Sequence, residues 1–202
     1  MANLADPAQF GLLSATLLRR AGIPAALYGG LALAAYGRTR LTRDADFAVA
    51  PTDGADLVAA FAAGGLRARC EFDTLRVGGL VLSRALVLGD GAHSGHNVVD
   101  AVQPRDRLYA QRVLDRRISG ELLGQAVDLV SPEDYVILKA LSDRPVDFED
   151  AASVLVRMAD SLDFAVVDQE VQVLADSLRD HDTAGHWRAI VARAGQLRRG
   201  LL

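Results

Sequence analysis

Residues 28–50 read YGGLALAAYGRTRLTRDADFAVA, and this stretch decides how the rest of the sequence is interpreted. The glycine pair Gly29-Gly30 interrupts an apolar segment, and a short run rich in alanine and leucine follows it. A basic turn then leads to Asp44-Ala45-Asp46 and to an apolar, strand-like run. Because side chains two residues apart on a strand point to the same side, the two carboxylates are expected on one face of a sheet. Such a pair on a buried strand is costly unless a cation lies between the carboxylates, so a divalent metal is the predicted partner.

The composition is that of a folded protein. The chain has 202 residues, of which 50% are hydrophobic and 24% charged, enough for one large core or two small ones. A net charge of −4 argues against a general nucleic-acid coat protein but leaves room for a local basic patch. The single cysteine, Cys70, excludes an intrachain disulfide and is expected to be a buried thiol.

The N-terminal sequence does not have the basic and apolar regions of a signal peptide. The longest apolar run, residues 23–36, is too short to span a bilayer and contains two glycines. We therefore expect a cytoplasmic protein.

The residue pattern predicts an α+β fold with a change of character near residue 130. Helices are expected over 7–21, 31–36, 55–63, 132–142, 147–160, 167–179 and 183–199, and strands over 25–28, 44–50, 67–72, 74–77, 80–88, 96–102 and 126–130. Residues 104–111 are expected to be irregular or a short helix. Ser131-Pro132-Glu133-Asp134 is typical of a helix start, with a capping hydroxyl, a proline and acids in the first turn. The expected organisation is a mixed sheet flanked by helices over 1–130 and a helical domain over 131–202.

A third carboxylate, Asp100, lies within the strand-like run HNVVDAV. If the strands pair side by side, Asp44, Asp46 and Asp100 converge at one edge of the sheet. Three such carboxylates are the usual ligands of two divalent ions that support in-line phosphoryl or nucleotidyl transfer. Oxygen ligands favour Mg²⁺ or Mn²⁺ over zinc. The glycine pair ahead of a helix offers N–H groups that a phosphate can approach.

Lys139 is the only lysine among 22 basic residues. In a chain that otherwise uses arginine, a lysine indicates a position that needs a compact ammonium group. The alternative is an ordinary solvated lysine that has survived by chance. Asp147 and Asp150 follow at a helix start, where acids are also ordinary capping residues.

Two segments carry a resemblance to a known family. The run GGLALAAYGRTRLTRDADF resembles the first motif of the polymerase-β-type nucleotidyltransferase superfamily, in which a Gly-Gly or Gly-Ser turn and a helix precede a D-x-D pair. Its R-x-T-x-D-x-D form is similar to the branch of abortive-infection and toxin–antitoxin nucleotidyltransferases. The run SPEDYVILKALSDRPVDFEDAASVL resembles the helical motif in which a lysine follows a capped helix start and an R-x-K-D-x-x-D segment comes next.

The resemblance implies an enzyme that moves a nucleoside monophosphate from an NTP to a hydroxyl acceptor and releases pyrophosphate. It implies metal ligands at Asp44, Asp46 and Asp100, with Asp100 also helping to deprotonate the acceptor. It implies nucleotide contacts at Gly29, Gly30, Arg40, Thr42, Lys139 and Asp150, of which Lys139 is also expected to serve catalysis. Val146 departs from the family pattern, which often has a lysine or arginine at this position.

The acceptor is left open by the sequence. The toxin branch implies tRNA as acceptor and a cognate antitoxin as partner, whereas an antibiotic-type enzyme would act on a small hydroxylated compound. A non-catalytic nucleotide-binding module is a third possibility, against which the three intact carboxylates count. The arginines at 105, 107, 112, 116 and 117 either steer a phosphate-bearing acceptor such as RNA or form a solvated surface. His181 and His186 fall in the C-terminal helical region, and their spacing alone does not indicate a metal site.

Overall fold

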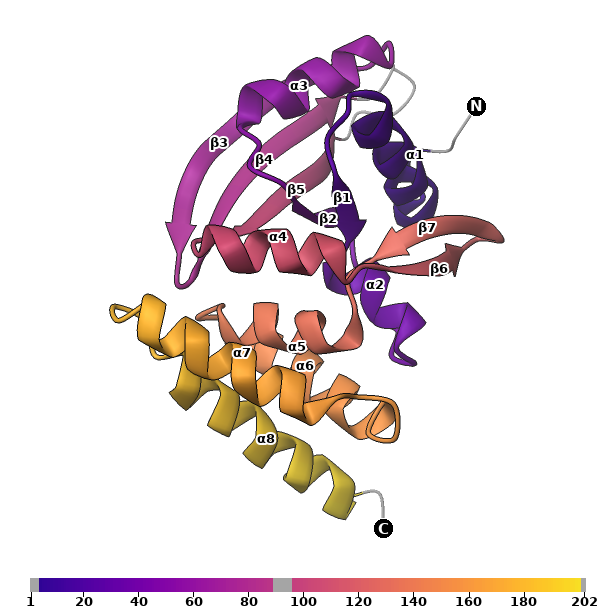
Figure 1. Cartoon of the computed structure of the whole chain (residues 1–202). Coiled ribbons are helices and arrows are strands. Elements are labelled where there is room, and N and C mark those ends of the chain that lie inside the picture. Colours follow the sequence, from indigo (N-terminus) through magenta and orange to yellow (C-terminus); the bar gives the residue numbers. More distant parts are fainter. Residues whose placement is uncertain (1–3, 89–95, 201–202) are drawn as a thin grey trace.

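The computed structural model of the chain describes residues 4–88 and 96–200. Within these ranges it contains eight helices and seven strands (Figure 1). The helices are α1 (Pro7–Arg20), α2 (Gly29–Ala35), α3 (Gly54–Ala63), α4 (Arg107–Asp115), α5 (Pro132–Ala140), α6 (Pro145–Arg157), α7 (Phe164–Ser177) and α8 (Thr183–Gly200). The strands are β1 (Ala25–Leu27), β2 (Asp44–Val49), β3 (Arg67–Val77), β4 (Leu80–Leu88), β5 (His96–Pro104), β6 (Ile118–Leu122) and β7 (Gln125–Leu129).

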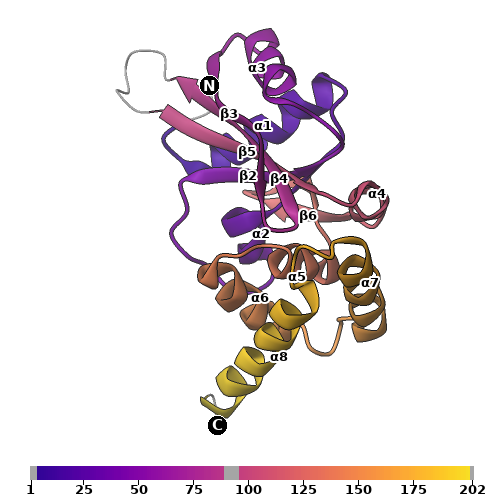
Figure 2. The same ribbon diagram turned by 90° about the vertical axis from the view of Figure 1, so that its left-hand side faces the viewer.

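The seven strands form one mixed sheet in the order β3-β4-β5-β2-β1-β7-β6. Strand β2 pairs in parallel with β5, and β1 pairs in parallel with β7, whereas the other neighbours are antiparallel. Both ribbon views place α1 and α3 toward one end of the molecule and α5–α8 toward the other, with the sheet between them (Figures 1 and 2). The predicted α+β fold, a mixed sheet with flanking helices followed by a group of helices, is confirmed.

Local chemistry explains where the helices begin. Asp6 caps α1 by accepting hydrogen bonds from two backbone N–H groups, and Pro7 occupies the first turn. Ser131 caps α5 by accepting from the backbone N–H of Asp134. The helix start predicted at Ser131 is therefore confirmed.

The structure differs from the prediction in the middle of the chain. The two strands expected before residue 78 are a single strand, β3, with irregular register around Phe72 and a positive φ of 49° at Thr74. Of the alternatives for 104–111, the helix is correct, because Asp106 caps α4. Strand β6 was not predicted, since its short sequence has little apolar alternation and it forms only by pairing with β7. Cys70 lies exposed on the edge strand β3, so the expectation of a buried thiol is wrong.

One apolar core runs through both halves of the chain. It includes Phe10, Phe47 and Phe61 from the sheet and the helices near it, and Ile137 and Trp187 from the helices beyond. Every residue of α5 from Asp134 to Ala140 is buried. Helix α5 packs against α6, α7 and α8, and its Tyr135 contacts Tyr28 and Tyr36 of the N-terminal half.

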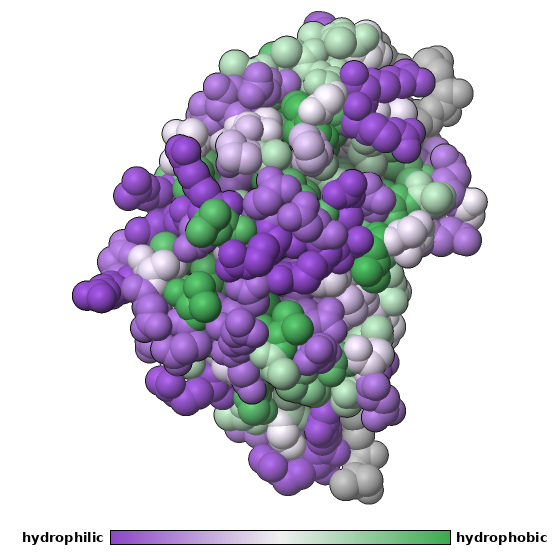
Figure 3. All heavy atoms as spheres, viewed as in Figure 1, coloured by the Kyte–Doolittle hydropathy of each residue, from purple (hydrophilic) through white to green (hydrophobic). Residues whose placement is uncertain are grey.

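The view in Figure 3 shows a face that is mostly hydrophilic, with apolar residues in small separate patches. Among residues 4–88 and 96–200, no helix has both the length and the apolar character needed to cross a membrane.

Candidate active site

The parallel pairing of β2 with β5 brings the three predicted carboxylates together. Asp46 and Asp100 are register partners on these strands, and Asp44 lies two residues before Asp46. Partners in register and residues two apart share one face of a sheet. All three carboxylates therefore lie on the same face of two neighbouring strands.

The glycine pair makes room for the acidic strand. Gly29 begins α2 with a φ of +61°, and a Cβ atom built on it would lie 1.9 Å from Oδ2 of Asp46. A Cβ atom on Gly30 would lie 2.8 Å from Cβ of Thr42. Both glycines are buried, and the Tyr135 hydroxyl donates a hydrogen bond to the Gly29 carbonyl. Any larger residue at Gly29 would push Asp46 out of place.

The negative charges of the three carboxylates repel one another. Burial, together with the negative charge of Asp100, raises the pKa of Asp46 to about 6, although Lys139 acts in the opposite direction. Burial and Asp100 also raise the pKa of Asp44, an effect that Arg84 partly offsets. A cation between these groups would stabilise their ionised forms.

Arg84 was not singled out by the sequence, yet it contacts the site directly. It lies opposite Asp100 in the β4–β5 pairing, and its guanidinium group donates two hydrogen bonds of 2.7 Å to the two oxygens of Asp100. The group also lies 5.1 Å from the ring centre of Phe72 and 3.6 Å from a carboxylate oxygen of Glu71. The sequence alone does not mark an arginine in a strand as a site residue, because the strand register decides which residue it pairs with.

Lys139 is buried rather than solvated, with 2% of its side chain exposed. Its ammonium group lies 2.5 Å from Oδ1 of Asp147 and 3.9 Å from Oδ2 of Asp150. The rings of Tyr28 and Tyr135 lie 4.8 and 5.4 Å from it, as in cation–π contacts. Lys139 is therefore a buried, paired cation, and the alternative of an ordinary solvated lysine is wrong.

Asp150 connects the two halves of the chain. It is fully buried, and its carboxylate lies 3.2 Å from Nε of Arg40 and 3.5 Å from Nη1 of Arg38. The structure thus places two residues expected to contact nucleotide, Arg40 and Asp150, in contact with each other. Thr42, a third, donates a hydrogen bond of 3.3 Å to the backbone carbonyl of Asp44.

Arg144 is a second cation that the sequence did not single out. It donates two hydrogen bonds to Asp147, of 2.8 and 3.0 Å, while 61% of its side chain stays exposed. Its charge acts to lower the pKa values of Asp44 and Asp46, which burial and Asp100 raise. A signal was present in the sequence, because Arg144 is the first residue of the segment that resembles R-x-K-D-x-x-D.

The three carboxylates fit a hard divalent cation. Their donor atoms are all oxygens, and burial together with the charge of Asp100 raises the pKa values of Asp44 and Asp46, an effect that a bound cation would oppose. Asp100 is already neutralised by Arg84. A metal at Asp100 would therefore share this carboxylate with the guanidinium group or displace it.

The basic stretch after Asp100 is largely neutralised within the chain. Arg112 and Arg116 both pair with Glu170 at 2.7 Å, and Arg116 also pairs with Asp134. Arg105 pairs with Asp180 and Arg117 with Asp128. Four of the five arginines therefore have acidic partners.

A pocket of about 470 Å³ lies away from the carboxylates. It is bounded by α1 and the β6–β7 hairpin, with Leu12, Arg19 and Val127 in its wall. None of the predicted site residues lines it.

The sequence matches no protein-family model and no curated protein. The structure is similar to that of an antigenic nucleotidyltransferase-like protein from Paracoccidioides brasiliensis, at 18% identity over 89% of this chain and 90% of that chain, with a TM-score of 0.47. It is also similar to a solution structure of the antibiotic-resistance factor ANT(2'')-Ia, at 16% identity over 85% and 90% of the two chains and a TM-score of 0.47. For the complex of ANT(2'')-Ia with adenylyl-2''-tobramycin, the identity is 17% over 86% and 97%, with a TM-score of 0.45. Likenesses of this size do not assign an activity, so the functional conclusion rests on the geometry of the site.

Proposed function

We propose that the chain is a metal-dependent nucleotidyltransferase that moves a nucleoside monophosphate from an NTP to a hydroxyl acceptor. The observation that carries the proposal is the placement of Asp44, Asp46 and Asp100 on one face of two neighbouring strands. In the reaction, the acceptor oxygen bonds to the α-phosphorus while the bond from that phosphorus to pyrophosphate breaks. The hydroxyl proton leaves to a base.

The three carboxylates would hold Mg²⁺ or Mn²⁺. When bound, these ions supply positive charge that stabilises the α-phosphate and the leaving group. The chain's own contribution is position and charge, which dominate catalysis of this class of reaction.

Asp100 is the residue assigned to receive the acceptor proton. The two hydrogen bonds from Arg84 fix the orientation of its carboxylate. Arg144, whose side chain is 61% exposed and whose charge acts on Asp44 and Asp46, would bind the phosphates of the NTP. Lys139 acts through Asp147, which it shares with Arg144, and so holds Arg144 near the carboxylates.

Calorimetric titration of the chain with an NTP, with and without Mg²⁺, tests binding. Transfer of a label from the α-phosphate of the NTP to an acceptor tests catalysis. Asp44→Asn and Asp46→Asn should each abolish transfer without unfolding the chain. Full activity in either purified variant would contradict the assigned metal ligands. Magnesium-dependent binding without transfer to any acceptor would instead favour the nucleotide-binding module.

Two acceptors follow from this chemistry. One is tRNA, with a cognate antitoxin as regulator of the chain. The other is a small hydroxylated compound, and the pairing of Arg112, Arg116 and Arg117 with acids favours it, because these arginines have less charge to offer an RNA backbone. Parallel reactions with total tRNA and with a panel of polyhydroxylated small molecules separate the two by which product carries the label.

A further inference from the structure

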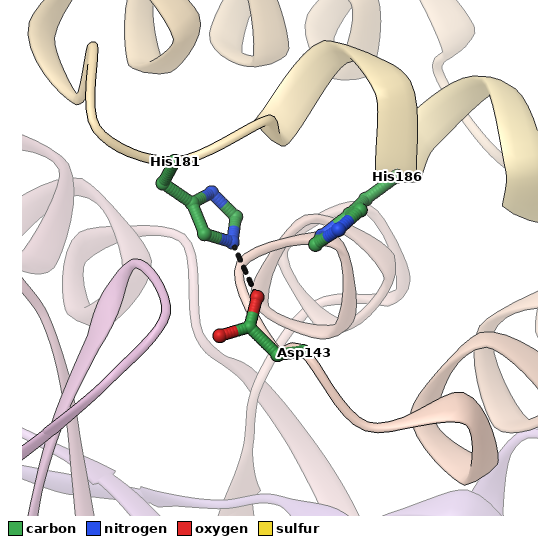
Figure 4. Close-up of side chains that lie close together, drawn as sticks. All are labelled: Asp143, His181 and His186. Carbon is green, nitrogen blue, oxygen red and sulfur yellow. Dashed lines mark ion pairs between the residues drawn. The ribbon is translucent and has the colours of Figure 1, made fainter.

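Three side chains outside the carboxylate site converge at the junction of the C-terminal helices. Asp143 lies in the connection between α5 and α6, His181 in the connection between α7 and α8, and His186 in the first part of α8. One ligand atom from each lies within 4.8 Å of the other two. Figure 4 shows His181 pointing at Asp143, with the two imidazole rings on neighbouring segments. We propose that this cluster binds a zinc ion or a similar divalent metal ion such as cobalt(II).

The hydrogen bonds of the two rings support this proposal. Nδ1 of His186 lies 3.1 Å from the Ala140 carbonyl, which can only accept, so this nitrogen carries the proton and Nε2 keeps its lone pair. A metal-ligating histidine characteristically donates its other N–H to such a carbonyl. Nδ1 of His181 lies 2.9 Å from the Thr183 hydroxyl. Both rings are thereby fixed in orientation.

The remaining nitrogen of His181 has no hydrogen-bond partner. Nε2 is buried, and its nearest acid, Oδ1 of Asp143, lies 3.3 Å away without forming a hydrogen bond. A buried nitrogen that makes no hydrogen bond is costly, and a metal ion bound together with Asp143 would satisfy it.

Two imidazoles and one carboxylate are a ligand set that zinc accepts, with water in the fourth position. The set differs from the all-carboxylate site, which suits magnesium or manganese. Arg105, whose charge acts on His181, is itself paired with Asp180. Asp143 itself is 56% exposed, which gives an ion a route from solvent.

Such an ion would connect three segments and fix the loop beside the proposed active site. Ser142 and Arg144, on either side of Asp143, both hydrogen-bond to Asp147, the partner of Lys139. The ion would therefore act as a structural clip on the loop that carries Arg144. This assignment does not depend on the proposed transfer reaction.

Metal binding is measured on the full chain after removal of metals with a chelator. Zinc and cobalt(II) are added in turn, and cobalt is followed by the visible absorption that it shows in a four-coordinate site. We expect one zinc or cobalt ion per chain at this site and a rise in Tm on zinc binding. Asp143→Asn, at an exposed position, should weaken binding at least about 10-fold, the scale on which loss of a supporting group acts in metal sites.

His181→Gln and His186→Gln should each remove the cobalt absorption, whereas Cys70→Ser, at the exposed cysteine of β3, should leave it unchanged. Circular dichroism establishes that each variant is folded. The combined variant Asp44→Asn/Asp46→Asn separates the two metal sites, and it should keep the cobalt absorption. Absence of stoichiometric metal binding would overturn the proposal. So would loss of the cobalt absorption in the combined variant if Asp143→Asn kept it in full.

Discussion

At Asp46, burial and charge oppose each other. The carboxylate is packed against Gly29 and lies beside Asp100, and its pKa is raised to about 6, first by burial and then by that second acid. A group in this position destabilises the folded chain once it is ionised. An acid that destabilises the fold when ionised is typical of a functional site, where its negative charge binds a cation.

Asp46→Asn should therefore separate stability from activity. Between the ordinary value of 3.8 and about 6, the folded chain binds more protons at Asp46 than the unfolded chain does, so stability falls as pH rises through this window. Without divalent ions at neutral pH, the variant should be more stable than the parent, on the order of 1–3 kcal/mol. The difference should vanish below the lower end of the window.

The same variant should lose transfer activity by roughly 100-fold or more, the scale on which removal of one electrostatic stabiliser acts. Urea unfolding across pH gives the stability, and label transfer gives the activity. Asp160→Asn, which removes an exposed acid, is the control and should change neither. A variant less stable than the parent at neutral pH would contradict the assigned cost of the charge.

Gly29→Ala tests the close approach of α2 to β2. Alanine at this position would combine a φ of +61° with a Cβ atom 1.9 Å from Asp46. We expect a loss of stability of about 1–3 kcal/mol from the strained backbone alone, and loss of metal-dependent NTP binding in addition. Gly22→Ala is the matched control, because Gly22 has a φ of +73° with nothing within 4 Å of the added Cβ. Equal NTP affinity in the two variants would show that Asp46 tolerates the displacement.

Arg84→Gln tests the competition for Asp100. Because the guanidinium group holds both oxygens of Asp100, its removal frees a metal ligand, and Mn²⁺ should bind the chain several-fold more tightly in the absence of nucleotide. Electron paramagnetic resonance of free Mn²⁺ measures the affinity. Arg76→Gln, on the exposed surface of the neighbouring strand, is the control. Weaker binding in Arg84→Gln would mean that orientation of Asp100 outweighs the competition.

At the scale of elements, the pairing of α5 with α6 depends on a buried charge network. Lys139 comes from α5 and Asp147 from the first turn of α6, and both are nearly inaccessible to solvent. Burial alone would raise the pKa of Asp147, but the hydrogen bonds from Arg144 and the ammonium of Lys139 hold it well below its usual range. Removal of the lysine leaves the buried Asp147 with Arg144, whose side chain is 61% exposed, as its remaining cationic partner.

Lys139→Met should therefore destabilise the chain by about 3 kcal/mol or more, as loss of one partner from a buried pair does. Combining it with Asp147→Asn should cost less than the sum of the single changes by at least about 1 kcal/mol. Urea unfolding of the four chains gives this coupling. Additive effects would show that Lys139 and Asp147 do not act as a pair.

At the scale of the whole molecule, the sheet and the C-terminal helices share one apolar core. Arg40 and Asp150 add a polar contact between the two halves, and Tyr36 donates a hydrogen bond to the Val130 carbonyl at their boundary. Separating the two halves of the chain would expose apolar surface that is buried between them.

Thermal unfolding should therefore be a single cooperative transition in which the calorimetric and van't Hoff enthalpies agree. Removing the Arg40–Asp150 contact with Arg40→Ala should lower the Tm without splitting the transition. Two separate transitions would instead indicate that residues 1–130 and 131–202 fold as independent domains.

Many of the helices and strands could be predicted from local sequence, that is, from residues a few positions apart in the chain. Helix starts such as Ser131-Pro132 and the placement of Asp44 and Asp46 on one face depend only on local periodicity and capping. The α+β class follows from the order of such segments. Strand β6 could not be predicted, because it acquires its conformation from β7 rather than from its own residues.

The sequence by itself determined the fold class, the paired acids of β2 and the special position of the single lysine. Only the tertiary structure decided that Asp100 lies in register with Asp46, that Arg84 holds Asp100, and that Lys139 is buried against Asp147. It also brought together Asp143 and His181, from two connections between helices, and His186, from α8. The physical reason is that periodicity and caps act between neighbours in the chain, whereas strand register and helix packing are set by burial of residues far apart in sequence.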